Sequence, residues 1–188
     1  MEAFRFGVKM FVDGAAPPAG AFVPVFHSWI QKQCIEGHLL VDVHDYSHIH
    51  HGPGILLVAH EGNFSMDSAE GRLGLVYYRK QPLSGPLADR LGAALKSALL
   101  GCRLLQEEPG LAPPVRFRAD EVVFFANDRL LAPNEDQVFM EVRPALAAVF
   151  KRITGGDVRI IHLNPKSKER FAVRVELGES GSRLLLGV

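Results

Sequence analysis

The sequence predicts an α+β domain in which a mainly antiparallel sheet packs against a long buried central helix and two further helices. Most of the strand-like runs are separated by short turns, and short turns join antiparallel neighbours. One segment, residues 87–108, carries a broad Leu and Ala stripe that is typical of a deeply buried helix. The 188 residues contain no internal repeat and no break in composition, so we expect one domain spanning residues 1–188.

The first half of the chain predicts four strands and one helix. Apolar residues at every second position from Phe4 to Val12 indicate a half-buried strand. Residues 24–36 carry an apolar stripe, and Gly37 ends the expected helix. Three further strands are expected at residues 39–45, 55–64 and 72–80. The second of these begins as a continuous apolar run, which favours a central position in the sheet.

The second half adds a hairpin, a third helix and closing strands. Residues 115–118 and 122–127 predict the two arms of the hairpin. Asn134 is expected to cap the third helix together with Gln137, and Pro144 to kink or divide it. The remaining strands are expected at residues 158–163, 171–177 and, at an edge, 184–186. The expected order is therefore β-α-β-β-β-α-β-β-α-β-β.

Composition limits the classes of function. Hydrophobic residues make up 47% of the chain and charged residues 22%, as in ordinary globular proteins, and the net charge is +0. Balanced charge argues against a general nucleic-acid-binding protein, which usually shows a basic stripe. We interpret the excess of basic residues after Phe150, including Arg170 and Arg174, as solvated surface. Asp128 and Arg129, at the end of a strand, are expected to pair with each other or with neighbouring backbone.

The two cysteines and the N-terminal residues say little about function. Cys34 and Cys102 lie in apolar segments expected to be helical, so we expect buried free thiols and no disulfide framework. The opening residues, MEAFRFGVKMFVDG, contain no uninterrupted apolar region, so we expect no signal peptide. No run approaches the roughly 18 apolar residues of a membrane span. We therefore expect a cytoplasmic protein without membrane contact.

Residues 39–67 concentrate the unusual chemistry, because they hold five of the eight histidines. A strand would place Asp42 and His44 on one face, and His48 and His50 would continue that face if the chain stayed extended. Imidazole and carboxylate groups suit a divalent metal such as Zn, Mn, Fe or Ni. These four residues are therefore the candidate metal ligands. No standard metal-binding spacing is present, and the alternative is that the histidines are solvated turn residues.

The same stretch offers acid and base groups, for which His44, His60 and Asp67 are the candidate catalytic residues. In a continuous strand His60 and Glu61 would point to opposite faces. They could serve one site only if a bulge intervened. The sequence contains no serine-nucleophile or nucleotide-binding motif, so whether the protein is an enzyme stays open.

Two other functions fit the same residues. A non-enzymatic binding or assembly module could form a homodimer by burying aromatic surface from Phe4, Phe26, Trp29 and Tyr78. A thiol redox protein would require the two cysteines to lie within disulfide reach. A small-molecule ligand is compatible with either.

Three phrases of the sequence, VPVFHSWIQ, HIHHGPGILLVAHEG and NDRLLAPN, resemble those of a bacterial family of uncharacterised proteins. This resemblance covers most of the chain and implies no activity. The order of elements is also similar to that of the OsmC/Ohr peroxidase-like fold, whose members use two cysteines, one of them on the central helix. Cys102 can be carried onto that helix, whereas Cys34 lies ahead of it, where the family has no counterpart. The second resemblance therefore implies a fold without thiol-peroxidase activity.

Overall fold

The computed structural model describes residues 5–50, 52–165, 168–178, 181 and 184. Its eight strands form one antiparallel sheet in the order β2-β3-β4-β5-β1-β6-β8-β7. The strands are β1 Phe6–Phe11, β2 Leu40–Tyr46, β3 Gly54–Ala59, β4 Gly62–Asp67, β5 Gly74–Arg79, β6 Glu121–Ala126, β7 Arg159–Leu163 and β8 Ala172–Glu176. The helices are α1 Phe22–Lys32, α2 Leu87–Gln106 and α3 Asp136–Thr154, with short 3-10 turns at Ala19–Ala21 and Ala69–Gly71. The predicted α+β class with a mainly antiparallel sheet is confirmed.

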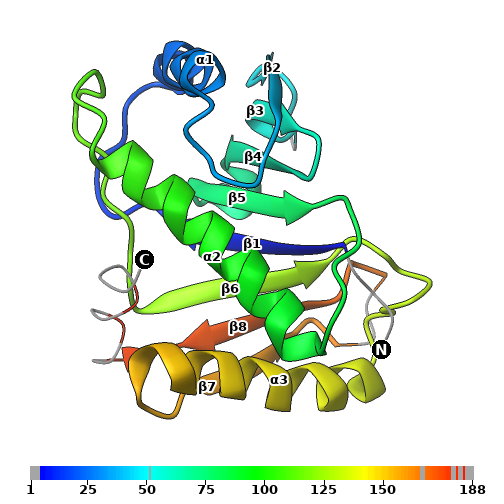
Figure 1. Cartoon of the computed structure of the whole chain (residues 1–188). Coiled ribbons are helices and arrows are strands. Elements are labelled where there is room, and N and C mark those ends of the chain that lie inside the picture. The colour runs from blue at the N-terminus through cyan, green and yellow to red at the C-terminus, as the bar shows by residue number, and fades with distance from the viewer. Residues whose placement is uncertain (1–4, 51, 166–167, 179–180, 182–183, 185–188) are drawn as a thin grey trace.

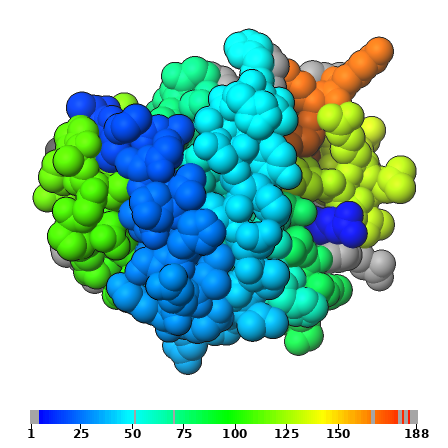
Figure 2. Space-filling view, turned by 90° about the horizontal axis from the view of Figure 1, so that it is seen from above, coloured from blue at the N-terminus to red at the C-terminus, as the bar shows by residue number. Residues whose placement is uncertain are grey.

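The three helices lie on one face of the sheet. Helix α2 crosses this face and packs against β1, β5 and α3 (Figure 1). Helix α1 packs against β2, and Figure 2 shows α1 and the β2–β3 hairpin side by side on the surface. None of the helices among the described residues is long and apolar enough to cross a membrane.

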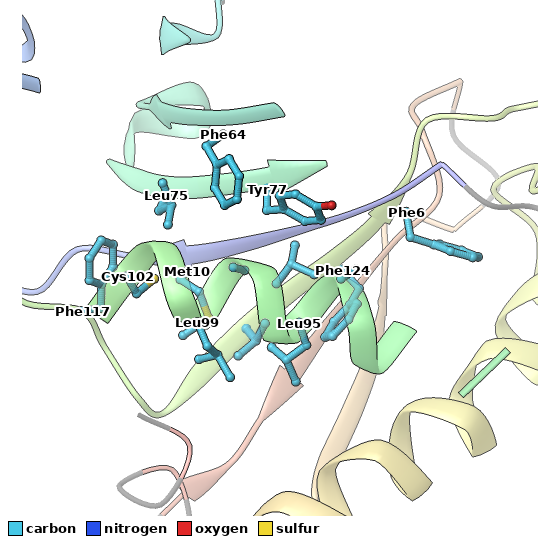
Figure 3. Close-up of a cluster of buried hydrophobic side chains, with 14 of the residues drawn as sticks. Phe6, Met10, Phe64, Leu75, Tyr77, Leu95, Leu99, Cys102, Phe117 and Phe124 are labelled. Atoms are coloured by element: carbon cyan, nitrogen blue, oxygen red, sulfur yellow. The ribbon is translucent and has the colours of Figure 1, made fainter. Parts of the chain in front are cut away.

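The core lies between the sheet and α2, as the alternation of side chains in a strand requires. Phe6, Val8 and Met10 of β1 all point toward the helices and are at most 2% exposed. Figure 3 shows Met10 beside Cys102 and Leu99 of α2, while Tyr77 lies further along the helix, toward Leu95. Burying each large apolar side chain contributes roughly 1.5–3 kcal/mol, so this layer is the main source of stability.

Close packing of α2 depends on a residue without a side chain. A Cβ atom at Gly101 would lie 2.7 Å from Cδ2 of Leu75 and 3.2 Å from the Phe64 ring. Glycine in a helix costs about 1 kcal/mol relative to alanine. Here it allows the helix to approach β4 and β5 closely, which is why a weak helix former occupies this position.

The strand predicted at residues 55–64 was wrong, because the structure divides it into β3 and β4 around a turn at His60 and Glu61. Side chains stabilise this turn. Oδ1 of Asn63 accepts the Ala59 N–H at 3.2 Å, and Oε2 of Glu61 accepts the Leu39 N–H at 2.8 Å. No bulge intervenes here, since Gly62 is the first residue of a new strand.

The hairpin predicted between residues 115–118 and 122–127 was also wrong. Phe117 forms an antiparallel bridge with Val12, and the Arg118 N–H donates to the carbonyl of Phe11 at 2.8 Å. Strand β6 pairs with β1 as well. Both segments therefore pair with β1 and not with each other. They lie one after the other along the same side of this strand, where its backbone groups form their hydrogen bonds.

Three details of the helices differ from expectation. Pro144 does not divide α3, since it lies on the exposed side where water can hydrate the carbonyl that proline leaves without a helical partner. The N-cap of α3 is Glu135 and not Asn134, whose side chain bonds to His162 and to the Asn164 carbonyl. Helix α1 ends at Lys32 with Gln33 in a left-handed conformation, so Cys34 lies outside the helix. The edge strand expected at 184–186 falls mainly outside the described residues.

Candidate functional site

The opposite face of the sheet carries no helix among the described residues, yet it is not a simple solvated surface. On β1 the residues that point to this side are Gly7, Lys9 and Phe11. Lys9 is only 5% exposed and Phe11 only 3%. A lysine and a phenylalanine this well covered indicate that other side chains fold over the helix-free face.

A row of paired residues crosses the centre of this face. Val76 of β5 pairs with Lys9 of β1, Lys9 pairs with Val123 of β6, and Val123 pairs with Arg174 of β8. Residues paired across antiparallel strands share a face. The backbones of Lys9 and Arg174 therefore lie two strands, or roughly 10 Å, apart, with Val123 between them.

Arginines stack on the two phenylalanines of this face. The Arg170 guanidinium lies 3.7 Å from the centre of the Phe125 ring, and the Arg72 guanidinium lies 3.6 Å from the centre of the Phe11 ring. The Phe125 ring in turn lies over Gly7, where a Cβ atom would overlap it. Such contacts contribute about 0.5–2 kcal/mol each and hold the charged groups in fixed positions.

These side chains surround a hollow of about 470 Å³, which we call the helix-free hollow. Its cations are Lys9, Arg129, Arg170 and Arg174, its carboxylates are Asp67 and Glu169, and its apolar lining includes Val76, Val123, Leu163 and Ala172. Four cations against two carboxylates leave a positive excess, although the whole chain has no net charge.

One of these cations, Lys9, is already paired with groups of the protein itself. Nζ of Lys9 donates to Oδ1 of Asp67 and to the Ala69 carbonyl, both at 3.1 Å. The same Asp67 oxygen accepts the Ala69 N–H at 2.6 Å. This pair ties β1 to the end of β4 and leaves little charge for a ligand.

Arg174 is held less completely, because it shares one carboxylate with two other arginines. Glu121 accepts hydrogen bonds from Arg72, one of them at 3.3 Å, and Nε of Arg118 lies 3.6 Å from its Oε1. Nε of Arg174 lies 3.5 Å from Oε2 of Glu121, but it is buried and makes no hydrogen bond to any described residue. Arg118 also bonds to Asp120, and this contact lowers the pKa of the Asp120 carboxyl and raises the pKa of Arg118.

Arg129 lies at the rim of the helix-free hollow. It lines the helix-free hollow and also a neighbouring one of about 630 Å³ at the start of α3. The side chain is exposed, and within the described part of the chain no hydrogen bond or ion pair holds it. Of the two expected arrangements for Asp128, the structure shows the second: its Oδ1 accepts the backbone N–H of Leu131 at 3.1 Å.

The described histidines of residues 39–67 do not gather into one site. Asp42 and His44 do lie together on one face of β2, with Nε2 of His44 3.4 Å from Oδ2 of Asp42. Strand β2 ends at Tyr46, so His48 and His50 lie in the following turn. His50 borders a separate hollow of about 380 Å³.

The candidate catalytic residues are likewise apart. His60 is exposed in the β3–β4 turn, whereas Asp67 binds Lys9 at the far end of β4. Within residues 5–50, 52–165, 168–178, 181 and 184, no three His, Cys, Asp or Glu side chains lie close enough to hold a metal ion.

Two histidines that were not predicted as site residues are the better covered ones. Nε2 of His38 lies 2.9 Å from the Tyr77 hydroxyl, and burial lowers the pKa of His38 and raises that of Tyr77. Nε2 of His162 lies 2.8 Å from Oδ1 of Asn134, its ring stacks on Phe139, and burial lowers its pKa. Neither histidine lines the helix-free hollow, and we interpret both as polar groups that close the ends of the core.

The aromatic and thiol hypotheses change as well. Phe26 and Trp29 are 0% and 3% exposed, so they belong to the core and do not contribute to the predicted dimer surface. Tyr78 is half-buried, and Phe4 lies outside the described residues. Both cysteines are free; Cys102 is buried and Cys34 partly buried, and burial raises the pKa of each thiol.

The cations of the helix-free hollow were missed by sequence reasoning. Arg170 and Arg174 were interpreted as solvated surface, and Lys9 as the polar side of a half-buried strand. One signal was available: the polar side of β1 contains Gly7 and Phe11, and β6 is apolar on both sides, which together indicate a covered second face.

Comparison of the chain with protein-family models, curated proteins and solved structures found no match.

Proposed function

We propose that this protein binds a small organic anion in the helix-free hollow. The single observation that carries the proposal is the partly unsatisfied guanidinium of Arg174, whose buried Nε makes no hydrogen bond among the described residues. The Nε atom itself faces Glu121, but the Arg174 side chain is 38% exposed and lines the hollow, so its terminal nitrogens can donate to a bound oxygen acceptor. Hydrogen bonds to charged groups contribute about 1.5–3 kcal/mol. The exposed Arg129 supplies a second cation at the rim of the same hollow.

The chemistry of the lining supports an anion. Guanidinium groups donate two parallel hydrogen bonds to a carboxylate or phosphate. Arg170 is already ordered by Phe125 and by a 3.2 Å bond from its Nη1 to Oδ1 of Asn127, so less conformational entropy is lost when a ligand binds. The volume of about 470 Å³ lies within the range of small-molecule sites.

The lining favours binding over catalysis. The described residues around the hollow include no histidine, cysteine or serine. The carboxylate of Asp67 is bonded to Lys9, and that of Glu169 accepts a hydrogen bond from the Asn164 amide at 2.7 Å. General acid–base or nucleophilic chemistry needs such groups within hydrogen-bond reach of the ligand. We therefore propose a binding protein.

Calorimetric titration at constant ionic strength tests the proposal, with phenyl phosphate, benzoate, citrate and inorganic phosphate as probes. At least one should bind, and Arg174→Ala should weaken it by about tenfold, the effect of losing a charge-assisted hydrogen bond. Arg143→Ala is the matched control, because Arg143 is exposed on α3 outside the hollow. If no probe binds, or if both variants weaken binding equally, the proposal is wrong.

A second candidate is self-association through the β2–β3 hairpin. Leu39, Val41 and Ile49 are 59%, 56% and 48% exposed and lie on this one hairpin or beside it. Exposed apolar side chains grouped in this way mark interaction surfaces. Sedimentation at micromolar concentration should show a dimer that Val41→Lys dissociates, while a wild-type monomer would remove this candidate.

A further inference from the structure

The floor of the helix-free hollow is apolar at its centre. Val123 lies between Lys9 and Arg174 in the cross-strand row, and Val76 continues the row on the other side of Lys9. Ala172 and Leu163 extend this apolar surface toward β7. Val123 is half-buried, so part of its surface faces the hollow.

The cations occupy the border of this floor. Arg174 lies beside Val123 on β8, and Arg129 and Arg170 come from the loops that follow β6 and precede β8. An acidic group bound by Arg174 and Arg129 would therefore leave the rest of its molecule above Val123. A bare phosphate ion would fill only a small part of the hollow and leave the apolar floor in water.

We infer that the ligand is an amphiphilic anion, with one carboxylate or phosphate group and an apolar body about the size of a ring that lies on Val123 and Ala172. This inference rests on the proposed function and goes further by naming the ligand class and Val123 as the residue that selects for it. Removing the apolar surface of the body and of the floor from water adds affinity that a bare ion cannot gain.

The test compares matched probes by calorimetry at constant ionic strength. Phenyl phosphate should bind at least about tenfold more tightly than inorganic phosphate, and benzoate more tightly than acetate, because only the larger member of each pair covers the floor. Equal affinities within each pair would overturn the inference while leaving anion binding intact. Absence of any binding would overturn both.

Val123→Thr gives a second, independent readout, since threonine has nearly the shape of valine and adds one hydroxyl. It should weaken phenyl phosphate by about fivefold and leave the inorganic phosphate affinity unchanged, because only the apolar body rests on this residue. Arg174→Ala should weaken both. If Val123→Thr leaves the affinity for phenyl phosphate unchanged, Val123 does not select the ligand and the inference is wrong.

Circular dichroism and thermal unfolding show whether Val123→Thr is folded. If it is not, Val123→Ile replaces it, since isoleucine keeps the β-branch and the apolar surface. The added methylene group should change the ratio of phenyl phosphate to inorganic phosphate affinity by reshaping the floor. An unchanged ratio would contradict the inference.

Discussion

The helix-free hollow and the β2–β3 hairpin region are both rich in charged or titratable side chains. They differ in whether the fold places these side chains close to one another. The hairpin region has five histidines close in sequence, yet the structure spreads the described ones along a strand and two turns. The hollow takes Lys9 from the start of the chain and Arg174 from near its end, and places them two strands apart. In this protein, charged side chains are brought together by the pairing of strands that are distant in sequence. The histidines of the single hairpin lie at separate positions along it.

Of the substitutions in the two regions, we expect those at Lys9 in the hollow to lower the free energy of unfolding most. Lys9→Met removes both of its hydrogen bonds and leaves Asp67 without its cation, so we expect a loss of about 2–3 kcal/mol in the free energy of unfolding. Urea denaturation measures it. Asp67→Asn and the double variant complete a cycle, and additive losses would show that the two side chains do not interact.

Acid sensitivity should come from the covered histidines. Because burial lowers the pKa of His38 from its usual 6.5, the unfolded chain takes up a proton that the folded chain resists. Stability contributed by neutral His38 is thus complete above the usual pKa and is lost as the pH falls below it. His162 has the same direction of shift.

Urea denaturation at about pH 7.5 and about pH 5.5 should show wild type losing more stability than His38→Gln, and the double variant with His162→Gln losing least. Comparing differences between the two pH values removes the constant cost of each substitution. An identical acid response in all three proteins would contradict the assignment.

The smallest effects are expected in the hairpin. The His44 and Asp42 side chains are 45% and 57% exposed, and such pairs contribute little, so His44→Ala should change stability by less than about 0.5 kcal/mol. One equivalent of Zn²⁺ or Ni²⁺ added to tag-free protein should move the midpoint of thermal unfolding by no more than about 1 °C. A larger stabilisation that His44→Ala abolishes would support metal binding at Asp42 and His44.

Local patterns were sufficient to predict most of the elements. The Leu and Ala stripe of α2 and the alternation in β1 both specified a buried face without reference to the rest of the chain. The β3–β4 turn was missed because no Asn-Gly pair marks it: its bonds come from Asn63 and Glu61, whose roles depend on the folded partners.

The candidate site could not be predicted in the same way. Lys9 and Arg174 meet only because β1 occupies the middle of the sheet and β6 separates it from β8. Nothing in the alternation of β1 or β8 specifies that order. Histidine density drew attention to residues 39–67, but density in sequence does not imply convergence in space.

The sharing of Glu121 has a consequence for how an occupant could come and go. Arg72 and Arg118 contact this carboxylate independently of Arg174. An arriving acid could therefore draw Arg174 toward itself while Glu121 stays neutralised, and its departure would return Arg174 to a partner that never changed place. The buried Glu121 carboxylate would then keep a cationic partner both when the ligand is bound and when it is absent.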